Sequence, residues 1–528
     1  MKQTSVTLMV AAALVNAPIS ATLAASGEPV TPVSIHAERL PWLRNIDPRF
    51  QSFQIGMSHL TGGETWRSYD SSQDNKAGAP RDFSAVREPR SPADLTNPRL
   101  RTLAAGLGPF YLRYGGTTSN SVYFQDNDEA RLAKAPEGYT VVLTRAAWKG
   151  GLEFARAVEA QVVTGFTVSS GVRDGVGAWT PRMAAPWLTY TRSIGGGIYA
   201  AELFNEPNAP EPGRTPKGQS ASDFARDFAV FRPFMAQADA SVKLVGPGVA
   251  TLGISTPVPS MDGATAEEYM TANPTPKFDI VSYHFYGAIA ERCAPPDSDA
   301  AISANRALTE EWLARPDKQF QKHKALRDRY APGAPIWLTE TGAAACGGMK
   351  WQPTFLDTFR YLDTEARLAR QGLDAIFTHA LISGSNGVID EKTLLPNADY
   401  WAALLWRRLM GTGVLDVGPI RPGLHIYAHC LRGTPGGVAV LAINLEQAPA
   451  AITLSAPAQL YALTAQQLQS RTVLLNGEPL AMATGDRLPE IVPKRLAGKQ
   501  VRLAPTSISF IALPGAGNPS CSGGPDRA

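Results

Sequence analysis

The sequence predicts an α/β fold in which a (β/α)8 barrel is followed by a smaller antiparallel β-sandwich. Three observations lead to this prediction: eight short apolar segments recur along the chain, helical patterns separate them, and the pattern changes after Gly411. Continuous apolar strands that alternate with helices are typical of a parallel sheet whose two faces are both covered. Eight strand–helix units are the number that closes such a sheet into a barrel.

The eight candidate strands are short and apolar. They are Ser52–Gly56, Phe110–Tyr114, Val162–Phe166, Ile198–Phe204, Lys243–Gly246, Phe278–Ser282, Ile336–Thr339 and Ala375–Thr378. One of the helices between them is clear, because Phe355, Phe359, Leu362 and Ala366 recur at helical spacing. Gly372 follows this pattern as a stop signal.

The barrel is therefore expected over residues 49–412, and residues 413–528 are expected to form the sandwich. Apolar residues there recur with the period of two that is typical of strands, at Val438, Val440, Ala442, Ile508, Phe510 and Ala512. Residues 26–48 are too extended and too rich in Pro for a barrel strand. We expect this N-terminal segment to contribute to the β-sandwich.

The N-terminus resembles a signal peptide over residues 1–25. Lys2 supplies a positive charge, Val6–Val15 form a short apolar run, and Ala24 and Ala25 offer small residues for cleavage. The apolar run is too short to cross a bilayer of roughly 30 Å, and no other segment could span a membrane. The sequence thus predicts a periplasmic or secreted protein, in whose oxidising surroundings four cysteines can form disulfides.

The composition narrows the possible partners. Apolar residues make up 44% of the chain and charged residues 18%, as in soluble globular proteins, and the net charge of +3 contains no long Lys/Arg run that would indicate nucleic acid. No His/Cys cluster has the spacing of a zinc site, no dinucleotide-binding fingerprint follows a strand, and no nucleophile-elbow motif occurs. We therefore expect no metal and no cofactor, and nothing in the sequence sets an oligomeric state.

Two glutamates follow predicted barrel strands. Glu206 lies in Phe204–Asn208 after the fourth strand, and Glu340 lies in Trp337–Thr341 after the seventh. Residues at the carboxyl ends of barrel strands face one common site. Glycoside hydrolysis requires two carboxyl groups that flank the scissile bond. Either glutamate alone could be a solvated loop residue, but their joint placement favours a catalytic pair.

Several segments carry a resemblance to a known family, and the resemblance covers nearly the whole mature chain. They are Leu100–Thr117, Glu202–Asn208, Trp337–Gly348, Asp399–Trp401, His429–Cys430 and Ala442–Leu445. They resemble glycoside hydrolase family 79, the family of heparanase and β-glucuronidase, in a bacterial-type form. The resemblance implies a TIM barrel of the glycoside hydrolase clan A type. It implies that Glu206 is the acid/base and Glu340 the nucleophile of a retaining double displacement.

The resemblance and the residue chemistry together assign a set of substrate-binding residues. Asn205 can bond the sugar 2-hydroxyl, and His284 and Tyr286 on the sixth strand can donate to Glu340, although both also fit core packing roles. In the family, the backbone N–H groups of paired glycines, here Gly347 and Gly348, help to bind the uronate carboxylate. By the same resemblance, further residues line the site, namely Gly115, Gly116 and Thr117.

The chain departs from the family pattern at three places. Ser385–Gly387, with Asn386 at its centre, stands where the family often has a Tyr that contacts the carboxylate. His379 aligns with a Gln of heparanase on the eighth strand. The loop after Glu340 is one residue longer and has Cys346 in place of an aromatic residue. These departures concern sugar preference and leave the catalytic pair unchanged.

The four cysteines allow three pairings, of which we expect Cys430–Cys521 and Cys293–Cys346. The resemblance implies the first pair, because heparanase ties a His-Cys strand to its extreme C-terminus. Cys293 and Cys346 follow neighbouring strands and should lie on the catalytic face. The alternative for this second pair is two free thiols.

Three functions remain open at this stage. The first is a β-glucuronidase that removes β-linked glucuronic acid from glycans or glycoconjugates, and the second is a heparanase-like endo-β-glucuronidase on uronate-containing polysaccharide. Residues 125–145 and 207–219 lack a dense basic cluster, which favours exo action or an unsulfated substrate. The third is a non-catalytic carbohydrate-binding relative, against which the presence of both Glu206 and Glu340 argues.

Overall fold

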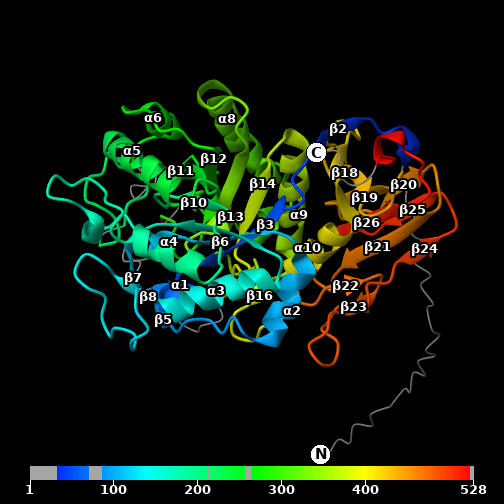
Figure 1. Cartoon of the computed structure of the whole chain (residues 1–528). Helices are drawn as coiled ribbons and strands as arrows, with labels where there is room; N and C mark the ends of the chain where they lie inside the picture. The colour runs from blue at the N-terminus through cyan, green and yellow to red at the C-terminus, as the bar shows by residue number, and fades with distance from the viewer. Residues whose placement is uncertain (1–31, 70–85, 212, 256–262, 296–297, 524–528) are drawn as a thin grey trace, which may run out of the picture.

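The computed structural model describes residues 32–69, 86–211, 213–255, 263–295 and 298–523. The predicted signal peptide at residues 1–25 lies outside these described residues. Within the described part of the chain, no helix has the length and apolar character needed to span a membrane. Figure 1 shows a barrel surrounded by helices beside a region of C-terminal strands coloured orange to red.

Eight parallel strands close into a barrel, which confirms the predicted fold class. They are β3 (Gln51–Gly56), β6 (Tyr111–Gly115), β9 (Gln161–Gly165), β10 (Ala200–Glu202), β11 (Lys243–Leu252), β12 (Ile280–Ile289), β13 (Ile336–Ala345) and β14 (Ala375–His379). Each of the eight predicted segments overlaps one of them. The strands β11, β12 and β13 run further than the sequence indicated, because they keep pairing with one another past shifts in register. Their extensions form one wall above the barrel.

The barrel interior is built in two layers, because alternate residues of each strand point inward. The lower layer is apolar and consists of Tyr111, Val163, Ala200, Val245, Ile280, Trp337, Ala375 and Phe377. Two positions further along their strands stand Arg113, Glu202 and His379. A polar layer therefore lies directly above an apolar plug, at the carboxyl ends of the strands.

Helices cover the outside of the barrel (Figure 1). They are α1 (Ser58–Thr61), α2 (Pro98–Leu107), α3 (Arg145–Ala157), α4 (Ala184–Ser193), α5 (Ala221–Ala238), α6 (Ala266–Thr271), α7 (Glu310–Leu313), α8 (Arg315–Tyr330), α9 (Phe355–Gln371) and α10 (Ala398–Leu409). The helix α9 begins at the predicted Phe355, and Gly372 ends it with a φ of 99°, which glycine adopts without strain. Residues 355–369 are all buried, because α9 lies between the barrel and the C-terminal sheets.

The C-terminal strands form two sheets. The larger contains β2 (Trp42–Asn45), β17 (Met410–Leu415), β18 (Leu424–Leu431), β19 (Val438–Asn444), β26 (Ser507–Leu513), β21 (Ala458–Thr464), β22 (Leu474–Leu475), β23 (Glu478–Pro479) and β24 (Lys494–Leu496). The smaller contains β1 (Val33–Ile35), β20 (Ala450–Leu454) and β25 (Gln500–Leu503). Apolar side chains of both sheets form one core cluster, and all strand pairs are antiparallel except β1 with β20. The N-terminal strands β1 and β2 thus complete sheets whose other strands come from the C-terminal part.

Short strand pairs and a disulfide complete the fold. The pairs are β4 (Gly63–Trp66) with β5 (Arg87–Arg90), β7 (Val122–Gln125) with β8 (Val141–Thr144), and β15 (Ile382–Ser383) with β16 (Ile389–Asp390). The predicted disulfide Cys430–Cys521 is present, with Cα atoms 5.4 Å apart. It ties β18 to the end of the described chain. Such a bond holds a terminal segment that would otherwise fray.

A buried histidine joins the barrel to the large sheet. His425 on β18 places Nδ1 2.6 Å from Asp363 of α9 and Nε2 3.0 Å from Glu310 of α7. Tyr427 donates to the same Asp363 oxygen at 2.6 Å. Burial opposes the charged imidazolium, but the hydrogen bond that the ring donates to Asp363 and the charges of Asp363 and Glu310 outweigh it and raise the pKa of His425. The protonated ring therefore stabilises the contact between the two regions.

This raised pKa predicts how stability depends on pH. A histidine whose pKa is higher in the folded chain contributes stability that is complete below its unfolded value, about 6.5, and is lost as pH rises through the folded value. His425→Gln should therefore lower the Tm and the free energy of unfolding more at pH 6 than at pH 9. The exposed His36→Gln is the matched control. An equal loss at both pH values would contradict this assignment.

Candidate active site

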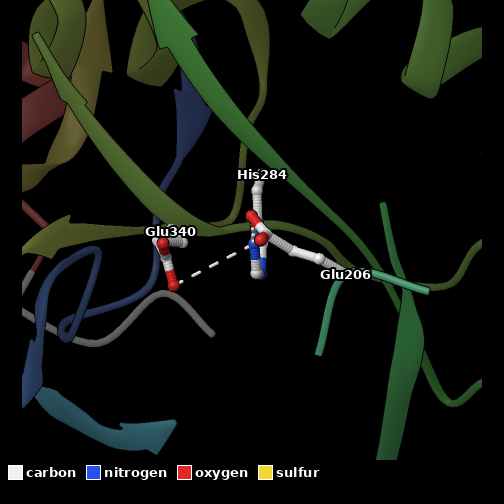
Figure 2. A group of neighbouring side chains, drawn as sticks. All are labelled: Glu206, His284 and Glu340. Carbon is white, nitrogen blue, oxygen red and sulfur yellow. Dashed lines mark hydrogen bonds and ion pairs between the residues drawn. The ribbon is translucent and has the colours of Figure 1, made fainter. Parts of the chain in front are cut away.

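Glu206 and Glu340 face each other at the carboxyl end of the barrel. Glu206 follows β10, and Glu340 lies within β13. One carboxylate oxygen of each, together with a ring nitrogen of His284, lie within 4.8 Å of one another. Figure 2 shows the three side chains converging, with His284 linked to Glu340 by a dashed line. Glu340 is buried, with 6% of its surface exposed, whereas the side chain of Glu206 is 18% exposed.

Two asparagines hold the backbone on either side of Glu206. The Asn120 side chain accepts from the N–H of Asn205 at 2.9 Å and donates to its carbonyl at 3.0 Å. The Asn208 side chain makes the same pair of bonds with the backbone of Ala250, at 2.8 and 2.9 Å. Glu206 itself has a φ of 51°, in the left-handed region that non-glycine residues rarely occupy. This fixed turn aims the carboxyl group into the barrel mouth.

The guanidinium of Arg113 connects both sides of the barrel from beneath the two glutamates. It is fully buried, donates to Glu202 at 2.8 Å and to Glu340 Oε2 at 2.8 Å, and also bonds the amide oxygen of Gln54. Its remaining donor reaches Asn205 Oδ1 at 2.8 Å. Planar guanidinium donors fix several acceptors at once. Arg113 therefore fixes the position of the Glu340 carboxylate relative to the loop that carries Glu206.

Tyr286 and His379 hold the other oxygen of Glu340. The Tyr286 hydroxyl donates to Oε1 at 2.6 Å, and His379 Nδ1 lies 3.1 Å from the same oxygen. Burial by itself would raise the pKa of Glu340, but His379, His284 and Arg113 lower it well below its ordinary value. Burial and the negative glutamates raise the pKa of Tyr286, so this hydroxyl stays a donor. Glu340 is thus an ionised carboxylate with donors at both oxygens.

His284 belongs to the site but does not line the pocket. The ring is fully buried, and Nδ1 lies 2.9 Å from Glu206 Oε1 and 4.0 Å from Glu340 Oε2. Its Nε2 has no hydrogen-bond partner among the described residues. The ring therefore supports the carboxyl group of Glu206 from below. The sequence placed it beside Glu340 as a donor, whereas its shorter contact is with Glu206.

A pocket of about 350 Å³ opens above the two glutamates. Nine of the predicted site residues line it, namely Glu206, Glu340, Tyr286, Gly115, Gly116, Thr117, Gly347, His379 and Asn386. Asn205, His284 and Gly348 are not among the lining residues. Asn205 and His284 support the pocket from beneath, and Gly348 packs against Asn386 and Gln352. The barrel thus brings all twelve together around one cavity.

A tight turn forms one wall of the pocket. Cys346, Gly347 and Gly348 have φ values of 72°, 85° and 84°. Arg292 donates to the carbonyl of Cys346 at 3.1 Å and to that of Gly347 at 3.3 Å. Because peptide units are planar and trans, the N–H groups of Gly347 and Gly348 point away from Arg292. No acceptor among the described residues bonds these two N–H groups.

The predicted disulfide Cys293–Cys346 is present at the start of this turn. Its Cα atoms are 6.5 Å apart, and both cysteines line the pocket. The bond connects the loop after β12 to the loop after β13. Together with Arg292, which directly precedes Cys293, it fixes the position of the glycine turn relative to the catalytic glutamates.

Glu206, His284 and Glu340 are also the described residues whose ligand atoms could approach one metal ion. The surroundings fit a cation poorly. Arg113 already occupies Glu340 Oε2, and Tyr286 and His379 occupy Oε1. A metal would have to displace these donors and would meet the guanidinium charge. The arrangement is suited to proton transfer and nucleophilic attack.

Sequence reasoning missed the residues that support the pair. Arg113 lay within the resemblance to family 79, but nothing local indicated that it bonds Glu202 and Glu340. Asn120 and Gln54 carried no signal of their own. The alternation of β6 offered a partial clue, since Arg113 stands two residues after the inward-facing Tyr111. A charge at an inward position of a barrel strand requires buried partners.

No protein-family model matches the chain, but individual relatives align with most of it. Heparanase-like protein 1 of Arabidopsis thaliana is 27% identical, over 81% of this chain and 86% of its own length. Hyaluronoglucuronidase of Hirudo nipponia is 26% identical, over 81% and 91%. Inactive heparanase-2 of Homo sapiens is 26% identical, over 79% and 82%. These similarities support a glycoside hydrolase related to heparanase, while membership of family 79 and the bacterial-type form stay predictions.

Solved structures share the fold. The GH51 arabinofuranosidase of Xanthomonas axonopodis pv. citri has a TM-score of 0.60 at 15% identity and covers 91% of this chain and 99% of its own. A 4-O-α-L-rhamnosyl-β-D-glucuronidase of Fusarium oxysporum 12S has a TM-score of 0.59 at 17% identity and covers 90% and 99%. Fold and paired carboxyl groups together thus define the class, a TIM-barrel glycoside hydrolase.

The central position of Arg113 predicts a large stability effect. Arg113→Met keeps the length of the side chain but leaves Glu202 and Glu340 buried without their shared cation. The free energy of unfolding should fall by about 3–5 kcal/mol, measured by denaturant titration. Glu202→Gln in the same chain should restore part of the loss, since it removes one of the two uncompensated charges.

The exposed Arg131→Met is the control and should leave stability within about 0.5 kcal/mol of the wild type. Wild-type stability of Arg113→Met, or a further loss in the double variant, would show that the guanidinium does not hold the two carboxylates together.

Proposed function

We propose that this protein is a retaining β-glucuronidase that releases β-linked glucuronic acid from glycans or glycoconjugates. The observation that carries the proposal is the unequal pair of carboxyl groups. Glu340 is buried and held ionised by donors at both oxygens, whereas Glu206 is partly exposed and its carboxyl group bonds only the His284 ring among the described residues. An ionised carboxylate opposite a proton donor is the arrangement that double displacement requires.

The spacing supports retention of configuration. Retaining enzymes hold their carboxyl groups about 5–5.5 Å apart, whereas inverting enzymes leave roughly 6.5–9.5 Å for a water molecule. The nearest oxygens of Glu206 and Glu340 lie within 4.8 Å. This gap leaves no room for a water molecule between the Glu340 carboxylate and the anomeric carbon, so we assign Glu340 itself as the nucleophile.

The reaction then proceeds in two steps. Glu340 attacks the anomeric carbon while Glu206 gives its proton to the glycosidic oxygen, and the leaving group departs as an alcohol. Water next gives a proton to Glu206, its oxygen attacks the anomeric carbon, and the ester bond to Glu340 breaks. Arg113, Tyr286 and His379 stabilise the carboxylate of Glu340 when it forms again. Asn205, whose amide oxygen Arg113 holds from beneath the pocket, stays the predicted partner of the sugar 2-hydroxyl.

The glycine turn supplies a place for the uronate carboxylate. The N–H groups of Gly347 and Gly348 are available to an anion, and Arg292 adds positive charge behind them. Asn386 stands in the same wall, and its amide oxygen accepts from Ser383 at 2.8 Å, which leaves its amide nitrogen as a donor. These donors take the place of the Tyr that the family often has. The names of the leech hyaluronoglucuronidase and the Fusarium glucuronidase support a glucuronide substrate.

Heparanase-like endo action is the second candidate, and the relatives with that name favour it. Sizing the products separates the two activities. Release of free glucuronic acid from chain ends supports exo action, whereas shortened oligosaccharides from heparan sulfate or hyaluronan support endo action. The relative named inactive heparanase-2 shows that similarity alone does not decide catalysis. The intact pair of Glu206 and Glu340 supports an active enzyme.

We also propose that the protein acts outside the cytoplasm, as a periplasmic or secreted enzyme. Two disulfides are stable only where the surroundings are oxidising, which supports export. The signal-like residues 1–25 agree with it. Fractionation of producing cells, followed by N-terminal sequencing of the mature chain, tests this proposal.

The roles of the two glutamates predict different responses to the leaving group. Glu206→Gln should lower kcat/KM about 10²–10⁴-fold for an alkyl β-glucuronide, because the departing alcohol needs a proton. The loss should be much smaller for an aryl β-glucuronide with an acidic phenol. Glu340→Gln should nearly abolish turnover of both substrates.

The control is Glu153→Gln on the exposed face of α3, which should leave both rates unchanged. Equal losses for both substrates in Glu206→Gln would refute its role as the acid. Activity of Glu340→Gln close to that of the wild type would refute the proposed mechanism as a whole.

A further inference from the structure

Two arginines and two glutamates form a cluster at the rim of the pocket. This rim cluster consists of Glu64 on β4, Arg87 on β5, and Glu211 and Arg214 in the loop after Glu206. All four residues line the same pocket as the catalytic glutamates. None of them takes part in the reaction proposed above, and the sequence pattern singled out none of them.

Glu211 is the centre of the rim cluster. One of its oxygens, Oε1, lies 2.5 Å from Arg87 Nη1 and 3.3 Å from Arg214 Nε. Glu64 is more distant, at 4.0 Å from Arg87 and 3.9 Å from Arg214, and its side chain is 53% exposed. Arg214 also donates to Thr118 Oγ1 at 3.1 Å. Glu211 therefore holds both guanidinium groups, and Glu64 only completes the charge balance.

The rim cluster lies on the side of the leaving group. The general acid must approach the glycosidic oxygen, so the wall that continues from Glu206 faces the departing group. Ala209, Pro210, Glu211 and Arg214 follow Glu206 in the chain and all line the pocket. The glycine turn borders the rim cluster, because Trp66, over which Arg87 is stacked, also lies against Gly347.

The described residues on this side of the pocket carry no net charge. The two guanidinium groups are balanced by two carboxylates, and apolar surface from Trp66, Ala209 and Pro210 lies beside them. The guanidinium of Arg87 is stacked over the ring of Trp66, 4.6 Å from its centre. An anionic leaving group would have to compete with Glu211 for both arginines and would also be repelled by Glu64. Opposing charges at a site boundary are a recognised source of discrimination.

We propose that Glu211 determines leaving-group specificity: by holding Arg87 and Arg214, it makes the enzyme release glucuronic acid from uncharged sugars or aryl alcohols and discriminate against sulfated or carboxylated leaving groups. This inference rests on the proposed function. Beyond that function, the inference states the class of leaving group and the residue that selects the leaving group. Without Glu211, the same two arginines form an anion site.

A matched pair of substrates tests the proposal. Phenyl β-glucuronide with a para-methylsulfonyl group has an uncharged leaving group, and the para-sulfonate analogue has a charged one of similar size. The wild type should show a kcat/KM at least about 10-fold higher for the uncharged substrate. In Glu211→Gln the ratio should shift by about 10-fold or more toward the sulfonate, through KM, and added salt should reduce the shift.

Two further variants identify the cause. Arg87→Gln combined with Glu211→Gln should return the ratio toward the wild-type value, because the double variant lacks the Arg87 guanidinium that Glu211→Gln leaves without its closest carboxylate. Glu64→Gln should change the ratio less than Glu211→Gln, as its contacts are longer. A Tm for each variant shows that it is folded. The ratio of kcat/KM for the two substrates in the wild type tests the proposal without any substitution.

The outcomes separate the two proposals. Hydrolysis of neither glucuronide by the wild type would overturn the proposed function and this inference with it. Hydrolysis of both at equal kcat/KM, or an unchanged ratio in folded Glu211→Gln, would overturn only the role of Glu211.

Discussion

The buried guanidinium of Arg113 is the interaction on which the site depends. It stands in the polar layer of the barrel, directly above the apolar plug, and bonds oxygens from strands on both sides of the mouth. Burying a charge is costly unless it is paired and fully hydrogen-bonded. Arg113, Glu202 and Glu340 therefore require one another. The same contacts that satisfy the fold place the nucleophile, which couples the stability of the barrel to the geometry of the reaction.

Around this fixed centre, the surroundings of the pocket differ from wall to wall. The glycine turn, braced by Arg292 and the Cys293–Cys346 disulfide, presents backbone N–H groups to an anion. The wall beyond Glu206 is apolar or internally neutralised by Glu211. One pocket thus offers both backbone donors for a uronate and, next to them, a group of arginines that Glu211 and Glu64 balance. This combination follows from which loops the carboxyl ends of the strands bring together.

Local pattern in the sequence was enough to predict the eight strands and the helix that begins at Phe355. The order of the strands suggested the Cys293–Cys346 pair, and the resemblance to family 79 supplied Cys430–Cys521. It also placed Glu206 and Glu340 at strand ends, where a barrel gathers its site. It could not predict contacts between distant segments. Arg113 and Glu202 are 89 residues apart, and His425 and Asp363 are 62 apart. Nor could it show that β11 to β13 extend past the barrel, since register shifts depend on neighbouring strands. His284 and Asn205 accordingly lie beneath the pocket rather than in its lining.

The central claim is that Glu340 attacks the sugar directly, and the stereochemistry of the first product tests it most directly. Proton NMR of a β-glucuronide during its first minutes of hydrolysis reports which anomer of glucuronic acid appears before mutarotation. Two successive displacements at the anomeric carbon predict that β-glucuronic acid forms first. Initial formation of the α-anomer would mean that water attacks in a single step, and it would contradict the role assigned to Glu340.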